Sequence, residues 1–241
     1  AQDVKKLREM TNCGMMDCKK ALTEADGDFD KALEWLREKG KAASVKKAGK
    51  VAAEGVSYAA VINGVGVVLE VNSQTDFVAK NEIFQGFVKD LAAVIAEQNP
   101  ADVEALKACT YPGTDRTVTD VTNDRILSIG ENLQIRRFER YDESTVNVGY
   151  THMGGVIGVL VGLEVSDNLK GNPAVIELGK DIGMQAAAMR PLFMDKSDVD
   201  QATLDKEKEI LLIQATEENK TAAKPKPEQI IHKMVDGRIG K

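Results

Sequence analysis

Side chains that most often carry catalysis or bind metals are scarce in this chain of 241 residues. It has two histidines, three cysteines and only 5% aromatic residues. His152 and His232 lie far apart, so their spacing indicates no metal cluster. The cysteines are odd in number and irregularly spaced, which argues against a secreted disulfide scaffold and favours a reducing cytoplasm. We therefore expect a cytoplasmic protein that carries no cofactor and no metal.

Long apolar runs and an excess of positive charge are also missing. No stretch approaches the roughly 18 consecutive apolar residues that a membrane-spanning helix needs. No secretory signal peptide is recognisable, although the chain begins at Ala1 instead of a methionine. The net charge is −6 and the pI is near 5.2, which argues against nucleic-acid binding by the chain as a whole. We expect neither a membrane nor a nucleic acid among its direct partners.

The motifs of common enzyme classes are absent as well. Gly64 and Gly66 lie between or within predicted strands and open no helix, so they form no phosphate-binding loop. No Gly-x-Ser-x-Gly nucleophile elbow is present. Cys13 and Cys18 are not in a Cys-x-x-Cys redox motif, which favours buried structural thiols. The pattern favours a protein without covalent chemistry. An enzyme whose site has no recognisable motif is the alternative.

The first 40 residues predict three short helices around a small core. The whole chain is 43% hydrophobic, and its length suits one large domain or two smaller ones. Asp17 and Asp28 are the expected N-caps of the second and third helix, and Gly40 is the expected end of the third. The residues expected to point inward are Val4, Leu7, Met10, Cys18, Ala21, Leu22, Phe29, Ala32, Leu33 and Leu36.

Two segments beside these helices allow more than one interpretation. Met15 and Met16 fall in the predicted loop between the first two helices. They either plug the small core or form an adaptable contact surface, because methionine suits both roles. Residues 41–54 are rich in Ala and Lys and predict a basic linker, helical or extended, to the next domain.

The pattern then changes to strands and occurs twice. Residues 56–62 and 65–71 flank Asn63-Gly64, the signal of a β-hairpin with a type I′ turn. A helix over 82–98 follows. The second copy consists of strands over 148–153 and 156–165 and a helix over 174–188. Tyr58 matches Tyr150, residues 69–71 match residues 163–165, and Asn99-Pro100 matches Arg190-Pro191. Duplication of a ββα unit is the simplest explanation. Between the copies we expect a helix over 101–108, a turn over 111–114, a helix over 121–129 and a strand over 133–138.

A polar corner joins the hairpin of the first copy to its helix. Residues 72–74 are expected to end the strand, and Thr75, Asp76 and Asn81 can each cap a helix. Phe77 is either a lid on the core or an anchor offered to a partner. Only the first copy has Thr75-Asp76-Phe77-Val78-Ala79, since the second has Ser166-Asp167-Asn168-Leu169-Lys170. This difference between the copies favours the anchor.

Two further helices are predicted near the end of the chain. Residues 198–218 are strongly charged with sparse apolar positions, and residues 229–235 follow a break at Lys224-Pro225-Lys226-Pro227. A polar helix with a thin apolar seam is typical of a protruding helical hairpin that pairs with another surface. Ordinary helices that lie on the core are the alternative.

Several blocks of sequence, in order over essentially the whole chain, closely resemble the elongation factor Ts family. They include Met15-Met16-Asp17-Cys18-Lys19-Lys20-Ala21-Leu22, Val71-Asn72-Ser73-Gln74-Thr75-Asp76-Phe77-Val78-Ala79, and residues 4–11, 51–55, 129–132, 135–137 and 234–238. Members of this family are guanine-nucleotide exchange factors of elongation factor Tu in bacterial-type translation. The chain departs from the family at Asn12, where a glycine is usual, and members usually continue past Lys241.

The resemblance implies a partner and a mechanism. The chain would bind elongation factor Tu, GDP-bound or nucleotide-free, and promote GDP release so that GTP can rebind. Asp76 and Phe77, with Thr75 and Val78 beside them, fall on the wedge of the family. There the ring enters the G domain, displaces a helix and disturbs the Mg²⁺ and phosphate-binding elements. Asp76 would repel phosphate or oxygen-ligand groups, or only cap the helix. Other positions at or near partner contacts are Leu7, Met15, Met16, Lys19 and His152.

The resemblance also implies an α+β fold with a ubiquitin-associated-like N-terminal domain and a coiled-coil hairpin that forms a homodimer. The expected parts are a partner-docking domain (1–40), a basic linker (41–54), the first half of the core (55–140), its second half (141–194 and 228–241) and the hairpin (195–227). The rival hypothesis is a binding module that does not promote exchange. Phe77 distinguishes the two, since a scaffold would tolerate its loss.

Overall fold

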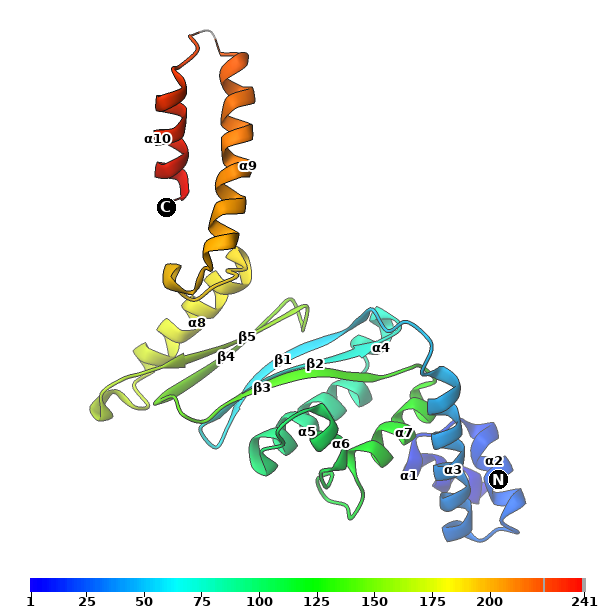
Figure 1. Ribbon diagram of the computed structural model, residues 1–241. Helices are drawn as coiled ribbons and strands as arrows, with labels where there is room; N and C mark the ends of the chain where they lie inside the picture. The colour runs from blue at the N-terminus through cyan, green and yellow to red at the C-terminus, as the bar shows by residue number, and fades with distance from the viewer. Residues whose placement is uncertain (223, 240–241) are drawn as a thin grey trace. The chain divides into compact units, whose positions relative to one another are not determined.

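The computed structural model describes residues 1–222 and 224–239 and has a mixed α and β fold with antiparallel sheets, as the sequence predicts. The chain divides into two compact units, Ala1–Met189 (the first unit) and Arg190–Lys241 (the second unit). Its main elements (Figure 1) are α1 (Gln2–Thr11), α2 (Met15–Glu24), α3 (Phe29–Lys47), β1 (Glu54–Ile62), β2 (Val65–Ser73), α4 (Asp76–Ala79), α5 (Glu82–Gln98), α6 (Val103–Ala108), α7 (Val118–Ile129), β3 (Gln134–Tyr141), β4 (Val146–His152), β5 (Ile157–Leu163), α8 (Pro173–Met189), α9 (Gln201–Lys220) and α10 (Glu228–Ile239).

Helices α1, α2 and α3 enclose a small core at the start of the first unit. Asp28 caps α3 as predicted, because its carboxylate accepts hydrogen bonds from the N–H groups of Asp30 and Lys31. The second helix begins earlier than predicted, at Met15, so Asp17 is not its N-cap. Asp17 instead pairs with Lys39 of α3. The buried residues of this core are Leu7, Cys13, Cys18, Ala21, Leu22, Ala25, Ala32 and Leu36.

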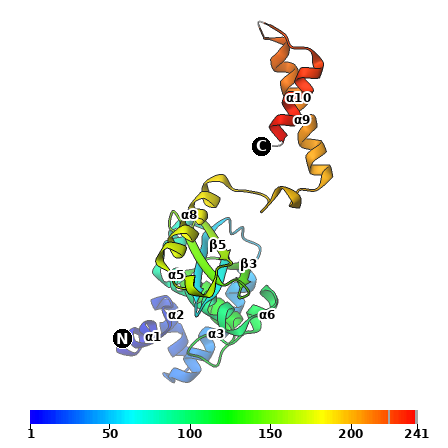
Figure 2. The same ribbon diagram turned by 90° about the vertical axis from the view of Figure 1, so that its left-hand side faces the viewer.

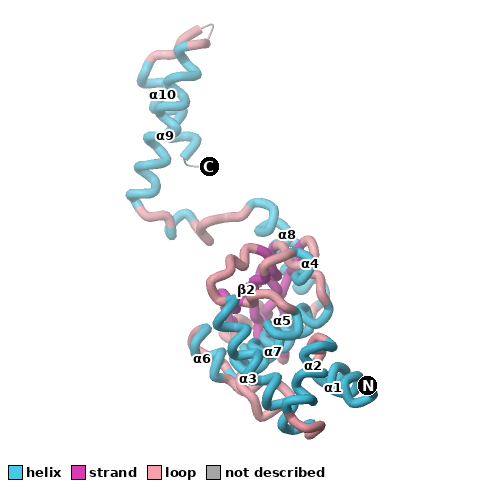
Figure 3. The backbone as a smooth tube through the Cα atoms, turned by 90° about the vertical axis from the view of Figure 1, so that its right-hand side faces the viewer, coloured by secondary structure: helices cyan, strands magenta, loops and turns pink. Residues whose placement is uncertain are grey.

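The third helix does not end at Gly40, as the sequence suggested, but continues to Lys47. Gly40 is buried, and a Cβ atom there would lie 3.1 Å from the backbone oxygen of Asn123 in α7. This glycine therefore permits the close packing of α3 against α7, which lie side by side (Figures 1 and 3). The predicted linker begins only after α3.

The first sheet has the order β1-β2-β3, with both pairs antiparallel. The predicted turn is confirmed, since Asn63 and Gly64 have positive φ values of 52° and 85°. A β-bulge lies between Glu70 and Val71, opposite Arg136, which interrupts the side-chain alternation along β3. Helices α4 to α7 contribute to the main core with the sheet. Its largest fully buried members are Phe84, Phe87, Leu69, Leu91, Ile95 and Leu106.

The order of two strands and a helix recurs in β4, β5 and α8. Asn99 and Arg190, which follow the two long helices and precede a proline, share the same left-handed φ of 48°. A short 3-10 turn, Asp167–Leu169, takes the place of α4. Within the described residues the second sheet has two strands, whereas the first has three.

The second hairpin packs against the free edge of β1. The N–H of Ser57 donates to the carbonyl of Gly155 at 2.7 Å, and the N–H of Ala59 donates to the Thr151 hydroxyl at 3.2 Å. A Cβ atom at Gly149 would lie 3.0 Å from the backbone carbonyl of Ala59. The absence of a side chain at Gly149 therefore lets the two hairpins approach closely (Figures 1 and 2).

In the second unit, α9 and α10 form a helical hairpin. The polar Lys208 of α9 pairs with Asp236 of α10 at 2.6 Å. Residues 228–241 are predicted to belong to the second half of the core, and this stays a prediction. Helix α10 packs against α9, and Gly240 and Lys241 lie outside the described residues. The apolar seam consists of Leu211, Leu212, Ala215, Ile231 and Val235.

Among the helices of the described residues, none is both long and apolar enough to cross a membrane.

The close approach at Gly149 predicts a specific loss of stability. Gly149→Ala should lower the free energy of unfolding by about 1–3 kcal/mol, because the new methyl group meets backbone atoms that have no room to move. Gly86→Ala in α5 is the matched control. Apart from its chain neighbours and the backbone of its own helix, no atom lies within 4 Å of its Cβ position. This variant should therefore keep its free energy of unfolding or gain about 0.5–1 kcal/mol. Urea denaturation followed by circular dichroism measures both, and equal stability of the two variants would contradict the prediction.

Candidate partner-binding site at the strand-to-helix corner

Residues 74–81, hereafter the corner, join β2 to α5 through the single turn of α4. Thr75 is the N-cap of α4, with an extended backbone, and its hydroxyl accepts a hydrogen bond from the N–H of Val78 at 3.4 Å. Asn81 is the N-cap of α5, and its side-chain oxygen accepts from the N–H of Ile83 at 2.8 Å. Two short-range caps thus create the abrupt change of chain direction that places Phe77 at the surface.

The ring of Phe77 points into solvent. Its side chain is 82% exposed, whereas the neighbouring Val78 and Ala79 pack partly against the main core. The interpretation of Phe77 as a lid on the core is therefore wrong. A large apolar ring that is left in water at a well-defined place is typical of a surface that binds a partner.

Of the two adjacent cap candidates, Thr75 and not Asp76 is the N-cap of α4. The carboxylate of Asp76 instead forms an ion pair with Lys80, one turn later, at 2.7 Å. The hydrogen bond from Lys80, together with its positive charge, lowers the pKa of Asp76 below its ordinary value. Asp76 therefore carries a full negative charge beside Phe77 at neutral pH.

Sequence reasoning missed the residue that holds the corner in place. The carboxylate of Glu131 accepts hydrogen bonds from the N–H of Gln74 at 3.0 Å, the N–H of Thr75 at 3.1 Å and the Thr75 hydroxyl at 2.7 Å. The N–H of Asn132 donates to the side-chain oxygen of Gln74 at 2.8 Å. The signals in the sequence were two adjacent polar residues, Glu131 and Asn132, among the four that separate α7 from β3, and the resemblance of residues 129–132 to the family. Nothing in the spacing indicates which distant segment they would meet.

A second candidate surface lies on α2. Met15 and Met16 are 60% and 72% exposed, and Lys19 on the same helix is also exposed. The two methionines therefore do not plug the small core, and the interpretation as a contact surface is the one that fits. Leu7, by contrast, is completely buried. It can support this surface from below but does not form it.

His152 lies at the end of β4, on the second hairpin. Its Nδ1 atom is 2.8 Å from the hydroxyl oxygen of Tyr150, within hydrogen-bonding distance. Next to it, Met153 at the turn is 74% exposed. The predicted contact residues thus fall at three places in the first unit, namely the corner, α2 and this turn. No group of three potential metal ligands occurs among His, Cys, Asp and Glu of the described chain.

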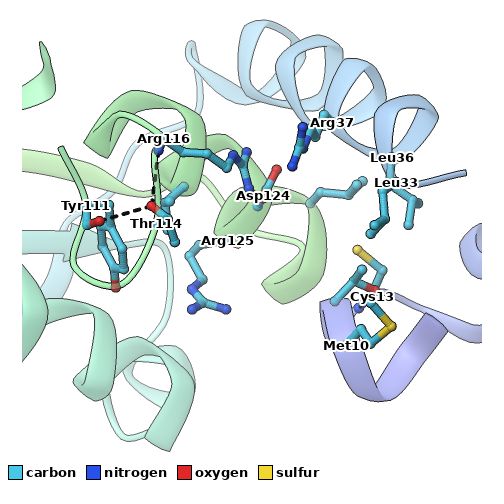
Figure 4. A pocket seen from close by; sticks show the side chains of 13 residues that line it. Met10, Cys13, Leu33, Leu36, Arg37, Tyr111, Thr114, Arg116, Asp124 and Arg125 are labelled. Atoms are coloured by element: carbon cyan, nitrogen blue, oxygen red, sulfur yellow. Dashed lines mark hydrogen bonds and ion pairs between the residues drawn. The ribbon is translucent and has the colours of Figure 1, made fainter. Parts of the chain in front are cut away.

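A cavity of about 260 Å³ lies between the N-terminal helices and the region around α7. Figure 4 shows that Arg37 and Arg116 lie close to Asp124, and Arg116 pairs with Asp124 at 2.5 Å. None of the predicted contact residues lines this cavity. It is a feature of the junction between α3 and α7 and not part of the candidate site.

Comparison with known proteins then identifies the family. A family model described as "Elongation factor TS" matches residues 74–241, which include the whole corner. Elongation factor Ts of Clostridium perfringens is 49% identical over 244 residues, covering all of this chain and 77% of the relative. The chain belongs to the elongation factor Ts family. Elongation factor Ts of Paramagnetospirillum magneticum is 49% identical, with coverage of 99% and 75%, and that of Magnetococcus marinus is 45% identical, with coverage of 100% and 77%.

Membership of the elongation factor Ts family places the chain among the nucleotide-exchange factors of protein biosynthesis. The role of such a factor is to change a binding equilibrium of another protein and not to make or break covalent bonds. A site made of one exposed aromatic ring and a neighbouring carboxylate, as at the corner, suits that role.

The ion pair at the corner predicts a change in acid titration. Lys80→Met should raise the pKa of Asp76 toward its ordinary value of about 3.9, because the hydrogen bond and the positive charge are lost. Since the pKa is lowered in the folded state, any stabilisation is present above the unfolded-state pKa and is lost as the pH falls through the lower folded value. Carboxyl ¹³C shifts measured against pH report this, and Asp200 in the second unit is the control. Identical Asp76 curves in both proteins would contradict the assignment.

Proposed function

We propose that this chain binds elongation factor Tu, in its GDP-bound and nucleotide-free forms, and promotes GDP release so that GTP can rebind. The observation that carries the proposal is the 82% exposed ring of Phe77 on a corner whose backbone is anchored by hydrogen bonds. The family supplies the partner, and a cytoplasmic location follows from a role in translation. The rival is a module that binds without promoting exchange.

Phe77 acts as a wedge that enters the G domain of the partner and disturbs its Mg²⁺ and phosphate site. An exchange factor must bind better to the nucleotide-poor conformation than to the nucleotide-bound one. Burial of a Phe side chain stabilises a complex by about 1.5–3 kcal/mol. A pocket for the ring that exists only in the nucleotide-poor conformation therefore gives a preference of roughly 10- to 150-fold. By linkage, bound GDP lowers the affinity of this chain for elongation factor Tu by the same ratio.

Asp76 adds a negative charge at the front of the wedge. Its ionised carboxylate lies beside Phe77, faces solvent and forms an exposed ion pair with Lys80. Inside the partner it repels phosphate and competes with the oxygen ligands of Mg²⁺, since like charges a few ångströms apart destabilise each other. Thr75 and Val78 contribute by fixing the backbone on both sides of the ring.

The N-terminal helices serve as a ubiquitin-associated-like docking domain (1–40). Of the predicted linker (41–54), residues 48–53 lie between α3 and β1. Met15, Met16 and Lys19 form its contact surface for the G domain, supported by the buried Leu7. The first half of the core (55–140) faces the G domain with Phe77. The second half (141–194) faces another domain of the partner through His152.

Removal of the ring is the decisive test. Phe77→Ala should lower the rate at which the chain releases a fluorescent GDP analogue from elongation factor Tu by tenfold or more, because the burial of the ring is lost. The circular dichroism spectrum should not change, since the ring makes little contact with the fold.

The control for this experiment is Val45→Ala, another truncation of an exposed apolar side chain, which is 79% exposed on α3. It should keep the rate of the unchanged chain. Acceleration that survives Phe77→Ala would refute the wedge and leave exchange to other contacts. Binding without acceleration by the unchanged chain would support the scaffold.

The helical hairpin is proposed to form a homodimer as a coiled coil. Ile210 and Ile213 of α9 are 39% and 58% exposed, although the seam with α10 is already filled by other residues. Residues three positions apart lie on the same face of a helix. They therefore form an apolar strip outside the seam, which a second copy of the hairpin can cover.

The double substitution Ile210→Glu and Ile213→Glu should shift the chain toward the monomer, because four carboxylates would meet across the interface. Sedimentation velocity at several concentrations measures the shift. Gln214→Glu, an exposed change on the same helix, is the control and should leave self-association as it is. If the double variant sediments like the unchanged chain, the hairpin is not the dimer contact.

A further inference from the structure

We propose that Glu131 is the positioning residue of the corner, which fixes the orientation in which Phe77 is presented. This inference deepens the proposed function, because the use of Phe77 as a wedge rests on it. The hydrogen bonds of Glu131 go to Gln74 and Thr75 and not to the ring of Phe77. Glu131 acts on the ring through the backbone of the two residues that precede α4.

Glu131 makes three hydrogen bonds to two consecutive residues of the corner. Its two carboxylate oxygens receive the N–H of Gln74, the N–H of Thr75 and the Thr75 hydroxyl. The same hydroxyl accepts from the N–H of Val78. A continuous chain of hydrogen bonds therefore runs from Val78 through Thr75 to Glu131. Hydrogen bonds to an ionised carboxylate are among the strongest in proteins, and members of such chains reinforce one another.

Among the side chains of the described residues, Glu131 makes the most hydrogen bonds to the corner. The Ser73 hydroxyl adds one to the carbonyl of Thr75 at 3.0 Å, and the Gln85 side chain adds one to the carbonyl of Ala79 at 3.3 Å. Helix α4 consists of four residues, far fewer than an isolated helix requires to persist in water. Phe77 contributes almost no packing, since it is exposed, and the pair between Asp76 and Lys80 is also exposed. Val78 and Ala79 pack partly against the main core, whereas Glu131 bonds the two residues that precede α4.

Glu131 is itself well placed to act as a fixed point. Gly130, with a φ of 87°, ends α7 and turns the chain so that Glu131 reaches the corner. The buried Asn132 donates one hydrogen bond to the carbonyl of Lys50 at 2.8 Å and another to the side chain of Gln74. Helix α7 packs along α3. The corner is thus connected to the N-terminal helices through one continuous element.

The first test uses the chain alone and is independent of any exchange activity. Glu131→Ala should increase the hydrogen–deuterium exchange rate of the amides at residues 74–78 by tenfold or more, because the acceptors of two of them are removed. Glu131→Gln retains one acceptor oxygen and should give an intermediate increase. Glu97→Ala, an exposed carboxylate on α5, is the control and should change nothing at the corner. Unchanged exchange at the corner in Glu131→Ala would overturn the proposal, and the milder Gln variant decides if the Ala variant does not fold.

The second test asks whether the effect passes through Phe77. GDP release from elongation factor Tu is measured at saturating chain for Glu131→Ala, Phe77→Ala and the double variant. Glu131→Ala should slow release at least fivefold on its own but by less than twofold when Phe77 is already Ala. If the double variant slows GDP release by the product of the two single effects, Glu131 does not act through Phe77, and its positioning role is overturned. If the unchanged chain fails to accelerate release, the proposed function fails, and the deuterium exchange still decides whether Glu131 orders the corner.

Discussion

Strand β1 is the constraint on which the first unit depends, because both of its edges are used. One edge pairs with β2 along its whole length, and the other carries the hydrogen bonds from Ser57 and Ala59 to the second hairpin. An uncovered strand edge would present unpaired backbone groups to other chains. By filling that edge, the second hairpin becomes part of the same packed unit. The corner and His152 are consequently held in a defined relation, although they belong to different copies of the ββα pattern.

Much of the fold was predictable from the sequence wherever interactions between neighbouring residues alone determine the structure. Asn63-Gly64 specified its turn, and Asn81 and Asp28 capped their helices, because short-range chemistry alone decides such features. Gly40 was misread, since a glycine also serves close packing, and only the position of α7 reveals that use. The sequence also did not reveal that α10 packs against α9, because the apolar face of an amphipathic helix does not indicate which element covers it.

The candidate site was predictable in its location but not in its construction. The difference between the two copies singled out Phe77, and the structure adds that its ring is exposed. The choice of cap between Thr75 and Asp76 depended on geometry that both residue types can satisfy. Glu131 escaped notice because its three hydrogen bonds join segments more than fifty residues apart. Leu7 was predicted both to point inward and to lie at or near a partner contact, and its complete burial confirms the first of these.

The connection of the corner to the N-terminal helices through α7 has a consequence for avidity. Under the proposed function, a partner that first touched the methionines of α2 would hold Phe77 near its pocket, so the second contact would be an intramolecular event with a high effective concentration. Each contact can then be weak alone, while the pair is strong. Weak individual contacts also separate one at a time, which allows a factor that must act repeatedly to leave its partner in steps instead of in one slow dissociation.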